Sequence, residues 1–239
     1  MKTQKDIIYG DPSIERHKLD LYMPDTSPQA VLVYFHGGGI ESGDKSARLD
    51  MTRLIDSGIG VVIPNYRMYP NVSYPQFLND AAQAVAWTYD NCKDMKIYIG
   101  GNSAGAYISM MLAFDNQYLN AYGIDPDSVS GYVFDAAQPT VHFNVLREFG
   151  IDTRRVIVDE RAPLYHITAD RNYPPMFVIC SDNDIENRYE QTLLFMSTLD
   201  HFGYGDRVEF KLMKGYGHCE YTSQPILCEM VSEFILKWC

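Results

Sequence analysis

The chain has 239 residues, of which 46% are hydrophobic, a size and composition that fit one globular domain with a full core. Its formal net charge is −11, so it lacks the basic character that binding to nucleic acids or anionic membranes requires. No apolar run approaches the length of a membrane span, and we expect neither nucleic acid nor a membrane as a partner.

Short apolar runs alternate with amphipathic segments along the whole chain. We expect strands at 6–9, 18–23, 30–35, 59–63, 97–99, 131–134, 176–180 and 208–212, and helices at 48–56, 77–89, 104–114, 144–149, 186–202 and 224–238. Residues 30–35 are apolar throughout, which is typical of a strand covered by helices on both faces. The alternation predicts an α/β fold with a mostly parallel central sheet and with its chemistry at the C-terminal ends of the strands.

Residues 135–173 show no clear periodicity apart from the expected short helix. We interpret them as a small lid, or as a substrate-shaping insertion, above the C-terminal edge of the sheet. No linker rich in proline, glycine or serine divides the chain, so residues 1–239 are expected to form a single domain.

The N-terminal residues lack the apolar core of a signal peptide, and the five cysteines show no paired spacing. We therefore expect free thiols in a reducing cytoplasm. Neither a Cys-x-x-Cys nor a His-x-x-x-His spacing occurs, so we expect no metal site.

The pentapeptide GNSAG at residues 101–105 joins an apolar strand to an apolar helix. A serine at such a turn has a strained backbone and needs small neighbours, which Gly101, Ala104 and Gly105 provide. The helix that begins here would present free N–H groups and positive dipole charge beside the Ser103 hydroxyl. The pentapeptide predicts a nucleophile elbow, although alone it is equally compatible with a serine that caps a helix.

Upstream of this turn, the sequence HGGG at residues 36–39 directly follows the apolar strand 30–35. Three glycines allow the backbone to approach a substrate closely and to point N–H groups into a pocket. Together with the N–H of Ala104 they would form the oxyanion hole of an ester hydrolase. A flexible loop or a phosphate-binding loop is the alternative, but the latter lacks both the Gly-Lys-Ser/Thr ending and the dinucleotide glycine spacing.

An acid and a base are expected after the last two strands. Asp184 follows the strand 176–180, where a carboxylate can hold a histidine in the required tautomer, and Asp182 is the alternative in the same loop. His218 follows GYG at 215–217, on a loop that the glycines loosen and that can bring it to Ser103 as general base. The order Ser103, Asp184, His218 is that of an α/β-hydrolase.

Together these motifs resemble the hormone-sensitive-lipase-like branch of the α/β-hydrolase esterases. Further stretches are similar to the small carboxylesterases that include acetyl-xylan and feruloyl esterases: LDLYMP at 19–24, SGDK at 42–45, NYRMYP at 65–70, YP at 74–75, Asp80, APL at 162–164 and PP at 174–175. The resemblance runs from about residue 19 to the C-terminus and implies an α/β-hydrolase fold.

The resemblance implies Ser103 as nucleophile, His218 as base and Asp184 as acid. It also implies an oxyanion hole formed by Gly37, Gly38 and Ala104. Two positions depart from the family pattern: Ser181 replaces a glycine three residues before the acid, and Ile40–Glu41 replace a bulky aromatic residue that many relatives carry. The second departure predicts a differently shaped substrate pocket, for which we consider Glu41, Tyr69, Phe143 and Tyr216.

We therefore expect a serine carboxylesterase that needs no cofactor and cleaves small-molecule esters with short acyl groups, with acetylated carbohydrates as the leading substrates. The alternatives are an arylformamidase-like amide hydrolase, an α/β-hydrolase shell that binds a ligand without turnover, and a thiol enzyme that uses Cys180 or Cys219. We also expect Arg67 and Asp80 to form an ion pair that braces the oxyanion loop.

Overall fold

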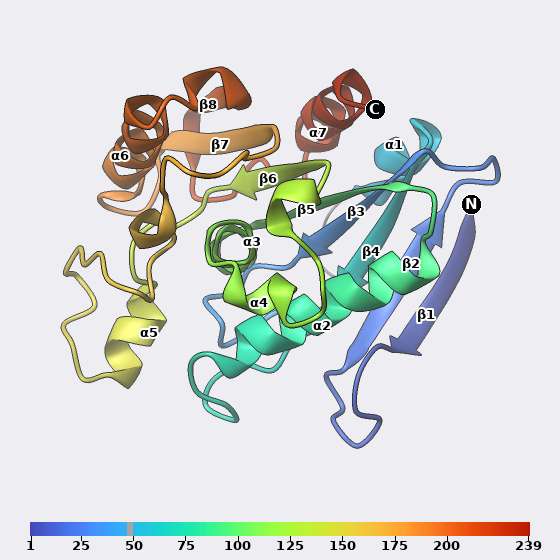
Figure 1. Cartoon of the computed structure of the whole chain (residues 1–239), viewed down its shortest axis with the longest axis horizontal. Coiled ribbons are helices and arrows are strands. Elements are labelled where there is room, and N and C mark those ends of the chain that lie inside the picture. Colours follow the sequence, from blue (N-terminus) through green and yellow to red (C-terminus); the bar gives the residue numbers. More distant parts are fainter. Residues whose placement is uncertain (47–49) are drawn as a thin grey trace.

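The structure, a computed structural model, describes residues 1–46 and 50–239, and in these residues eight strands form one mixed sheet (Figure 1). The strand order is β1-β2-β4-β3-β5-β6-β7-β8. The bounds are β1 (Lys2–Ile8), β2 (Lys18–Met23), β3 (Ala30–Phe35), β4 (Ile59–Pro64), β5 (Lys96–Asn102), β6 (Gly131–Asp135), β7 (Met176–Asn183) and β8 (Val208–Gly217). From β4 to β8 the neighbouring strands are parallel, while β2 pairs antiparallel with β1 and with β4. The expected mostly parallel sheet is confirmed.

Helices cover both faces of this sheet. They are α1 (Met51–Asp56), α2 (Gln76–Asn91), α3 (Ala104–Phe114), α4 (Gln117–Asn120), α5 (Phe143–Glu148), α6 (Arg188–His201) and α7 (Pro225–Lys237). The core on one face is formed with α2, α3 and α6, and the core on the other face with α1 and α7. The first residues expected in the helix at 48–56, Arg48 and Leu49, lie outside the described residues.

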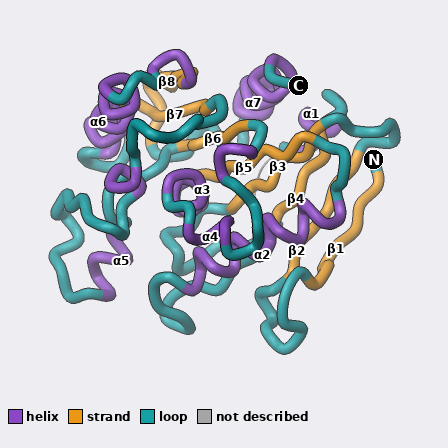
Figure 2. The backbone as a smooth tube through the Cα atoms, in the orientation of Figure 1, coloured by secondary structure: helices purple, strands orange, loops and turns teal. Residues whose placement is uncertain are grey.

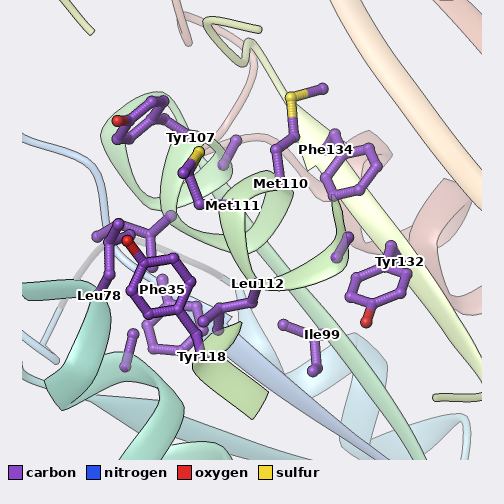
Figure 3. Packing of buried hydrophobic residues seen from close by; sticks show 14 of the residues in the cluster. Phe35, Leu78, Ile99, Tyr107, Met110, Met111, Leu112, Tyr118, Tyr132 and Phe134 are labelled. Carbon is purple, nitrogen blue, oxygen red and sulfur yellow. The ribbon is translucent and has the colours of Figure 1, made fainter. Parts of the chain in front are cut away.

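The apolar run of β3 supplies both cores at once. All six of its residues are buried, and Phe35 packs into the core around α3 while Tyr34 packs into the core around α7. Figure 3 shows the first of these cores, where Phe35 lies among side chains of α3 such as Leu112. Because every residue of α3 is buried, this helix is fixed tightly against the sheet. Burial of one aliphatic side chain contributes about 1.5–3 kcal/mol to the stability of the fold, so α3 and the turn before it are held firmly in place.

Residues 136–175, between β6 and β7, contain α5 and a short 3₁₀ turn at Pro163–His166, and most of this segment is loop (Figure 2). The expected loop 215–217 differs in the structure, because β8 continues to Gly217, which pairs with Asn183 of β7. Parallel pairing with a long neighbour thus overrides the two glycines. All five cysteines are described and are free, as expected. In the described part of the chain, no helix has the length and apolar character needed to cross a membrane.

Candidate active site

The turn between β5 and α3 places Ser103 in a strained conformation, with φ 54° and ψ −116°. Its backbone N–H donates to the carbonyl oxygen of Asp135 at the end of β6, at 2.8 Å. A Cβ atom on Gly105 would lie 2.0 Å from the carbonyl oxygen of Phe35, and one on Gly101 would lie 2.6 Å from the same atom. Glycine is therefore required where the turn and α3 approach β3, and the strain at Ser103 is held by this close packing.

Three side chains from separate loops form a hydrogen-bonded chain at this turn. The hydroxyl of Ser103 lies 2.8 Å from Nε2 of His218, and Nδ1 of His218 lies 2.5 Å from Oδ1 of Asp184. The side chain of His218 is 23% exposed, whereas that of Asp184 is fully buried. When Nδ1 carries the proton and donates it to Asp184, Nε2 is free to accept the proton of the serine hydroxyl.

Asp184 rather than Asp182 faces the imidazole. Burial raises the pKa of the Asp184 carboxyl, but the hydrogen bond and charge of His218, together with the Ile185 N–H at 2.7 Å, outweigh it and the pKa is lowered overall. Ser181, which replaces the family's glycine, donates its hydroxyl to the second carboxylate oxygen at 3.1 Å. Asp182 is exposed and accepts instead the backbone N–H of Gly215 at 2.7 Å. Of the two carboxylates left open by the sequence, Asp184 is the one that binds His218, and Asp182 does not.

In the glycine loop after β3, one of the N–H groups expected in the oxyanion hole is already bound. The N–H of Gly37 donates to the side-chain oxygen of Asn102 at 2.9 Å, so it is not available to a substrate, and the expectation for this residue is corrected. In residues 1–46 and 50–239, no acceptor binds the N–H groups of Gly38, Gly39 or Ala104. A Cβ on Gly37 would lie 3.2 Å from the Cβ of Ser103, so this glycine instead allows the loop to pack against the elbow.

His36 fixes the orientation of the first peptide in this loop. Its Nδ1 lies 2.8 Å from the carbonyl oxygen of Gly37, and its Nε2 lies 3.3 Å from a guanidinium nitrogen of Arg16. Burial lowers the pKa of His36 to about 4, so the ring is neutral at neutral pH, with Nδ1–H as donor and Nε2 as acceptor. Because N–H and C=O of a trans peptide point in opposite directions, a fixed Gly37 carbonyl also fixes the N–H of Gly38.

Two of the four residues considered for the substrate pocket, Glu41 and Tyr69, line the same cavity. Glu41 forms an ion pair with Arg147 of α5, and the Tyr69 hydroxyl donates to Glu148 of the same helix. Both line a cavity of about 580 Å³ between the loop 69–73 and α5. Phe143, at the start of α5, lies 3.5 Å from the position of a Cβ on Gly39. These contacts make α5 one wall beside the glycine loop.

The fourth residue, Tyr216, does not join them. Its hydroxyl donates to Gln224 at 3.1 Å, and its ring packs edge-on against Tyr221 on the side of α7. A cavity of about 440 Å³ lies nearer to the elbow, lined among others by Gly37, Gly38, Asn102 and Cys219. It extends from the glycine loop towards the segment that precedes α7.

The two cysteines considered as nucleophiles are poorly suited to that role. Burial raises the pKa of Cys180 to about 11 and that of Cys219 well above its usual range, so both are protonated thiols at neutral pH. Cys219 follows His218 and receives a long contact from the Asn102 amide, at 3.8 Å. Neither lies in the hydrogen-bonded chain at the elbow.

Sequence reasoning missed two groups of supporting residues. Asp135 is fully buried beneath the elbow, where burial raises the pKa of its carboxyl to about 7 and the Tyr221 hydroxyl donates to it at 2.5 Å. The second group holds the glycine loop: Asn102 accepts the N–H of Gly37, and Asn144 of α5 donates to the carbonyl oxygen of Gly39. A polar residue directly before the elbow serine was visible in the motif, but Asn144 lies in a segment without any pattern. In the described residues, no group of three or more metal-ligating side chains gathers.

Comparison with known proteins gives consistent results. The sequence model of the BD-FAE family matches residues 19–151. A probable isoprenylcysteine α-carbonyl methylesterase of Arabidopsis thaliana is 31% identical over 130 residues, which are 51% of this chain and 30% of that protein. An acetyl esterase of Salmonella schwarzengrund is 26% identical over 200 residues, 74% of this chain and 60% of that protein. The chain thus spans less than two thirds of the length of either relative.

Solved structures with the same fold include esterases. A truncated carbohydrate esterase from gut microbiota superposes with a TM-score of 0.81 at 17% identity, covering 100% of this chain and 96% of that one. Esterase B from Lactobacillus rhamnosis superposes with a TM-score of 0.78 at 16% identity, covering 99% of this chain and 84% of that one. At such identities the likeness establishes the fold, which is the expected one.

Proposed function

The chain belongs to the BD-FAE family of α/β-hydrolases, and from this premise we propose that it is a serine esterase for carboxylic esters with short acyl groups. The observation that carries the proposal is the hydrogen-bonded chain from Ser103 through His218 to Asp184, at distances of 2.8 and 2.5 Å. It lies at a strained turn beside a glycine loop in which the N–H groups of Gly38 and Gly39 face no acceptor among the described residues. Esterases among the relatives and structural neighbours add support.

In the proposed reaction, the Ser103 hydroxyl oxygen attacks the ester carbonyl carbon while its proton passes to Nε2 of His218. Asp184 stabilises the imidazolium that forms and keeps the ring oriented. When the tetrahedral intermediate collapses, the bond to the alcohol oxygen breaks and His218 returns the proton to the leaving alcohol. Water then attacks the acyl-enzyme, with His218 again accepting and returning one proton, and the carboxylic acid leaves.

The negative charge on the carbonyl oxygen needs donors that are in place before the reaction. We propose that Gly38, Gly39 and Ala104 supply them, with Gly39 taking the part that the sequence assigned to Gly37. Ala104 is the first residue of α3, so its N–H also benefits from the positive end of the helix dipole. Removal of one such donor costs roughly 10²–10³ in kcat.

Acetylated carbohydrates remain the substrates that we propose first. A structural neighbour is a carbohydrate esterase and a sequence relative is an acetyl esterase. The cavity of about 440 Å³ beside the glycine loop carries hydroxyl and carboxylate groups, from Ser46, Thr222, Ser223, Asp44 and Glu220. Such a lining suits a leaving group that bears several hydroxyls.

The test is hydrolysis of p-nitrophenyl acetate, butyrate and octanoate by the wild-type protein and by Ser103→Ala. We expect turnover of the two shorter esters, and a loss of kcat of at least about 10⁴ in the variant, because the nucleophile is gone. Ser197→Ala, at an exposed position on α6, is the matched control and should equal wild type. Equal rates for wild type and Ser103→Ala would show that the elbow is only a turn, and a folded protein that binds esters without releasing alcohol would favour a binding shell.

A further inference from the structure

The glycine loop contains three successive residues in the left-handed region, with φ 113° at Gly38, 67° at Gly39 and 63° at Ile40. Isoleucine is β-branched, and such residues rarely adopt positive φ. A strained segment of this kind persists only when surrounding contacts hold it. The contacts on its carbonyl oxygens therefore decide where its N–H groups point.

Two of these carbonyl oxygens are bound by backbone N–H groups. The carbonyl oxygen of Gly38 accepts the N–H groups of Glu41 and Ser42, and that of Ile40 accepts the N–H of Tyr69 at 2.9 Å. The carbonyl oxygen of Gly39 lies between them and is held differently. The side-chain nitrogen of Asn144, more than a hundred residues away on α5, donates to it. Among residues 1–46 and 50–239, no second donor reaches this oxygen.

Asn144 is built into this position. It is 1% exposed, its amide nitrogen also donates to Glu41 at 3.0 Å, and its backbone N–H is bound by the His142 ring that begins α5. Its side-chain oxygen is buried and has no partner in the described residues. An unpaired buried acceptor is unfavourable, and an apolar side chain of similar shape would avoid it. The donor function of the amide nitrogen is therefore what this position requires.

We propose that Asn144 is a positioning residue for the oxyanion hole, acting through the Gly39 carbonyl on the N–H groups of the glycine loop. The inference rests on the proposed function and adds to it a residue from the segment between β6 and β7. The Gly39 carbonyl shares its peptide with the N–H of Ile40, whereas the Gly39 N–H shares its peptide with the Gly38 carbonyl, which Glu41 and Ser42 hold. With Asn144 bound to the Gly39 carbonyl, both peptides that flank Gly39 are fixed, so its left-handed conformation and the direction of its N–H are held from both sides. Donors oriented in advance stabilise a transition state without reorganisation.

The same contact changes the interpretation of α5 as a lid. Arg147 and Glu148 of this helix also bind Glu41 and Tyr69. Together with Asn144, three side chains of α5 therefore contact the glycine loop, the residue after it, or the loop 69–73. If α5 lifted away during turnover, the Gly39 carbonyl would lose its partner at the moment when the oxyanion forms. On this proposal α5 stays in place during turnover and acts as a fixed wall.

The experiment compares Asn144→Asp and Asn144→Ala with wild type, using p-nitrophenyl acetate. Asparagine and aspartate have nearly the same shape, but the carboxylate cannot donate and would face the Gly39 oxygen and the Glu41 carboxylate. Arg154→Met is the control, because it removes an exposed ion pair with Asp152 in the same segment between β6 and β7 and leaves the Gly39 carbonyl bound. Each kcat is divided by the concentration of sites that react with a serine-directed phosphonate, so that misfolded protein is not counted.

We expect kcat per titrated site to fall about 10- to 100-fold in both Asn144 variants while KM changes less than about threefold, since the oxyanion forms only in the transition state. Arg154→Met should keep kcat within about twofold. The proposal is overturned if kcat per titrated site is unchanged in folded Asn144→Asp, if the loss lies in KM, or if Arg154→Met loses as much. Absence of turnover in wild type would instead contradict the proposed function itself.

Discussion

The two sides of Ser103 are held in different ways. On the oxyanion side, the carbonyl oxygens from Gly37 to Ile40 are each bound, and the peptides between them have fixed directions. On the acid–base side, His218 has a hydrogen bond at each ring nitrogen and its side chain is 23% exposed. The oxyanion side is fixed by several hydrogen bonds to its backbone carbonyl oxygens, and the acid–base side depends on one hydrogen-bonded chain of side chains.

This difference matches the chemistry proposed for each side. Oxyanion donors lose effectiveness if they must reorganise during the reaction. Backbone strain in the folded glycine loop is therefore offset by donors that already point in the required direction. A general base must accept a proton from one atom and deliver it to another, so its ring needs freedom to adjust. We expect substitutions on the acid–base side to affect the proton transfer alone, and substitutions on the oxyanion side to affect folding as well.

The largest effect is expected for Asp184→Asn. The amide keeps the shape of the carboxylate but stabilises the wrong tautomer of His218 and leaves the imidazolium without a counter-charge, so kcat should fall about 10³- to 10⁴-fold. Thermal unfolding should change little compared with this loss. Steady-state kinetics with p-nitrophenyl acetate measures the effect.

Asp182→Asn is the control on the same loop. Its carboxylate is exposed and, among the described residues, accepts only the backbone N–H of Gly215, so kcat should stay within about twofold of wild type. If instead Asp182→Asn loses activity and Asp184→Asn retains it, the acid–base side is not built as the hydrogen bonds indicate.

The motifs of the candidate site could be recognised in the sequence because each depends on local chemistry. Glycines that must approach β3, a serine between a strand and a helix, and polar residues at strand ends are all visible as short patterns. The positions of most elements followed for the same reason, but their bounds did so only in part. β1 begins at Lys2 and not at residue 6, β5 and β7 are longer than expected, α4 was not expected, and pairing with β7 extends β8 to Gly217. Fold class and family were thus accessible before any coordinates.

What the sequence could not supply depends on contacts between distant segments. That Asn102 occupies the N–H of Gly37 follows from the approach of β5 to the loop after β3, which a motif does not encode. The choice between Asp182 and Asp184 rests on a strand extension and on the direction of two side chains. Asn144 stands in a segment without periodicity, so its contact with Gly39 could be found only in three dimensions.

An intermediate effect is expected for the pH dependence of stability at His36. Its pKa is lowered from 6.5 to about 4 in the folded protein because the ring is buried. Between these values the unfolded chain binds more protons than the folded one, so this residue's contribution to stability is complete above pH 6.5 and is lost as the pH falls to 4. At about 1.4 kcal/mol per pH unit, the loss amounts to at most about 3 kcal/mol.

His36→Gln tests this by urea unfolding at pH 7, 5.5 and 4. Glutamine can donate to the Gly37 carbonyl and accept from Arg16 but does not titrate. The difference in unfolding free energy between wild type and variant should therefore shrink by up to about 3 kcal/mol as the pH falls. A difference that stays constant across this range would mean that His36 is not held neutral, and that the oxyanion side is less rigid than its contacts suggest.

The smallest effect is expected for the ion pair of Arg67 and Asp80, which supports the glycine loop indirectly. Arg67 and Asp80 form the expected ion pair, with guanidinium nitrogens 2.7 and 2.9 Å from the two carboxylate oxygens, and the Arg67 backbone N–H donates to the same carboxylate at 2.9 Å. Asp80 is 2% exposed on α2, while the Arg67 side chain is 29% exposed, so solvent screens part of the attraction. The pair fixes the chain just before Tyr69, whose N–H holds Ile40.

A double-mutant cycle with Arg67→Met and Asp80→Asn should give a coupling of about 1–2 kcal/mol in unfolding free energy. Because this brace acts two contacts away from the glycine loop, kcat should fall less than about threefold in each single variant, well below the loss expected for Asn144→Asp. A coupling energy of zero would mean that Arg67 and Asp80 do not brace the glycine loop. A kcat loss as large as that of Asn144→Asp would show instead that the loop is held by its whole surroundings, and that no single side chain decides the direction of its N–H groups.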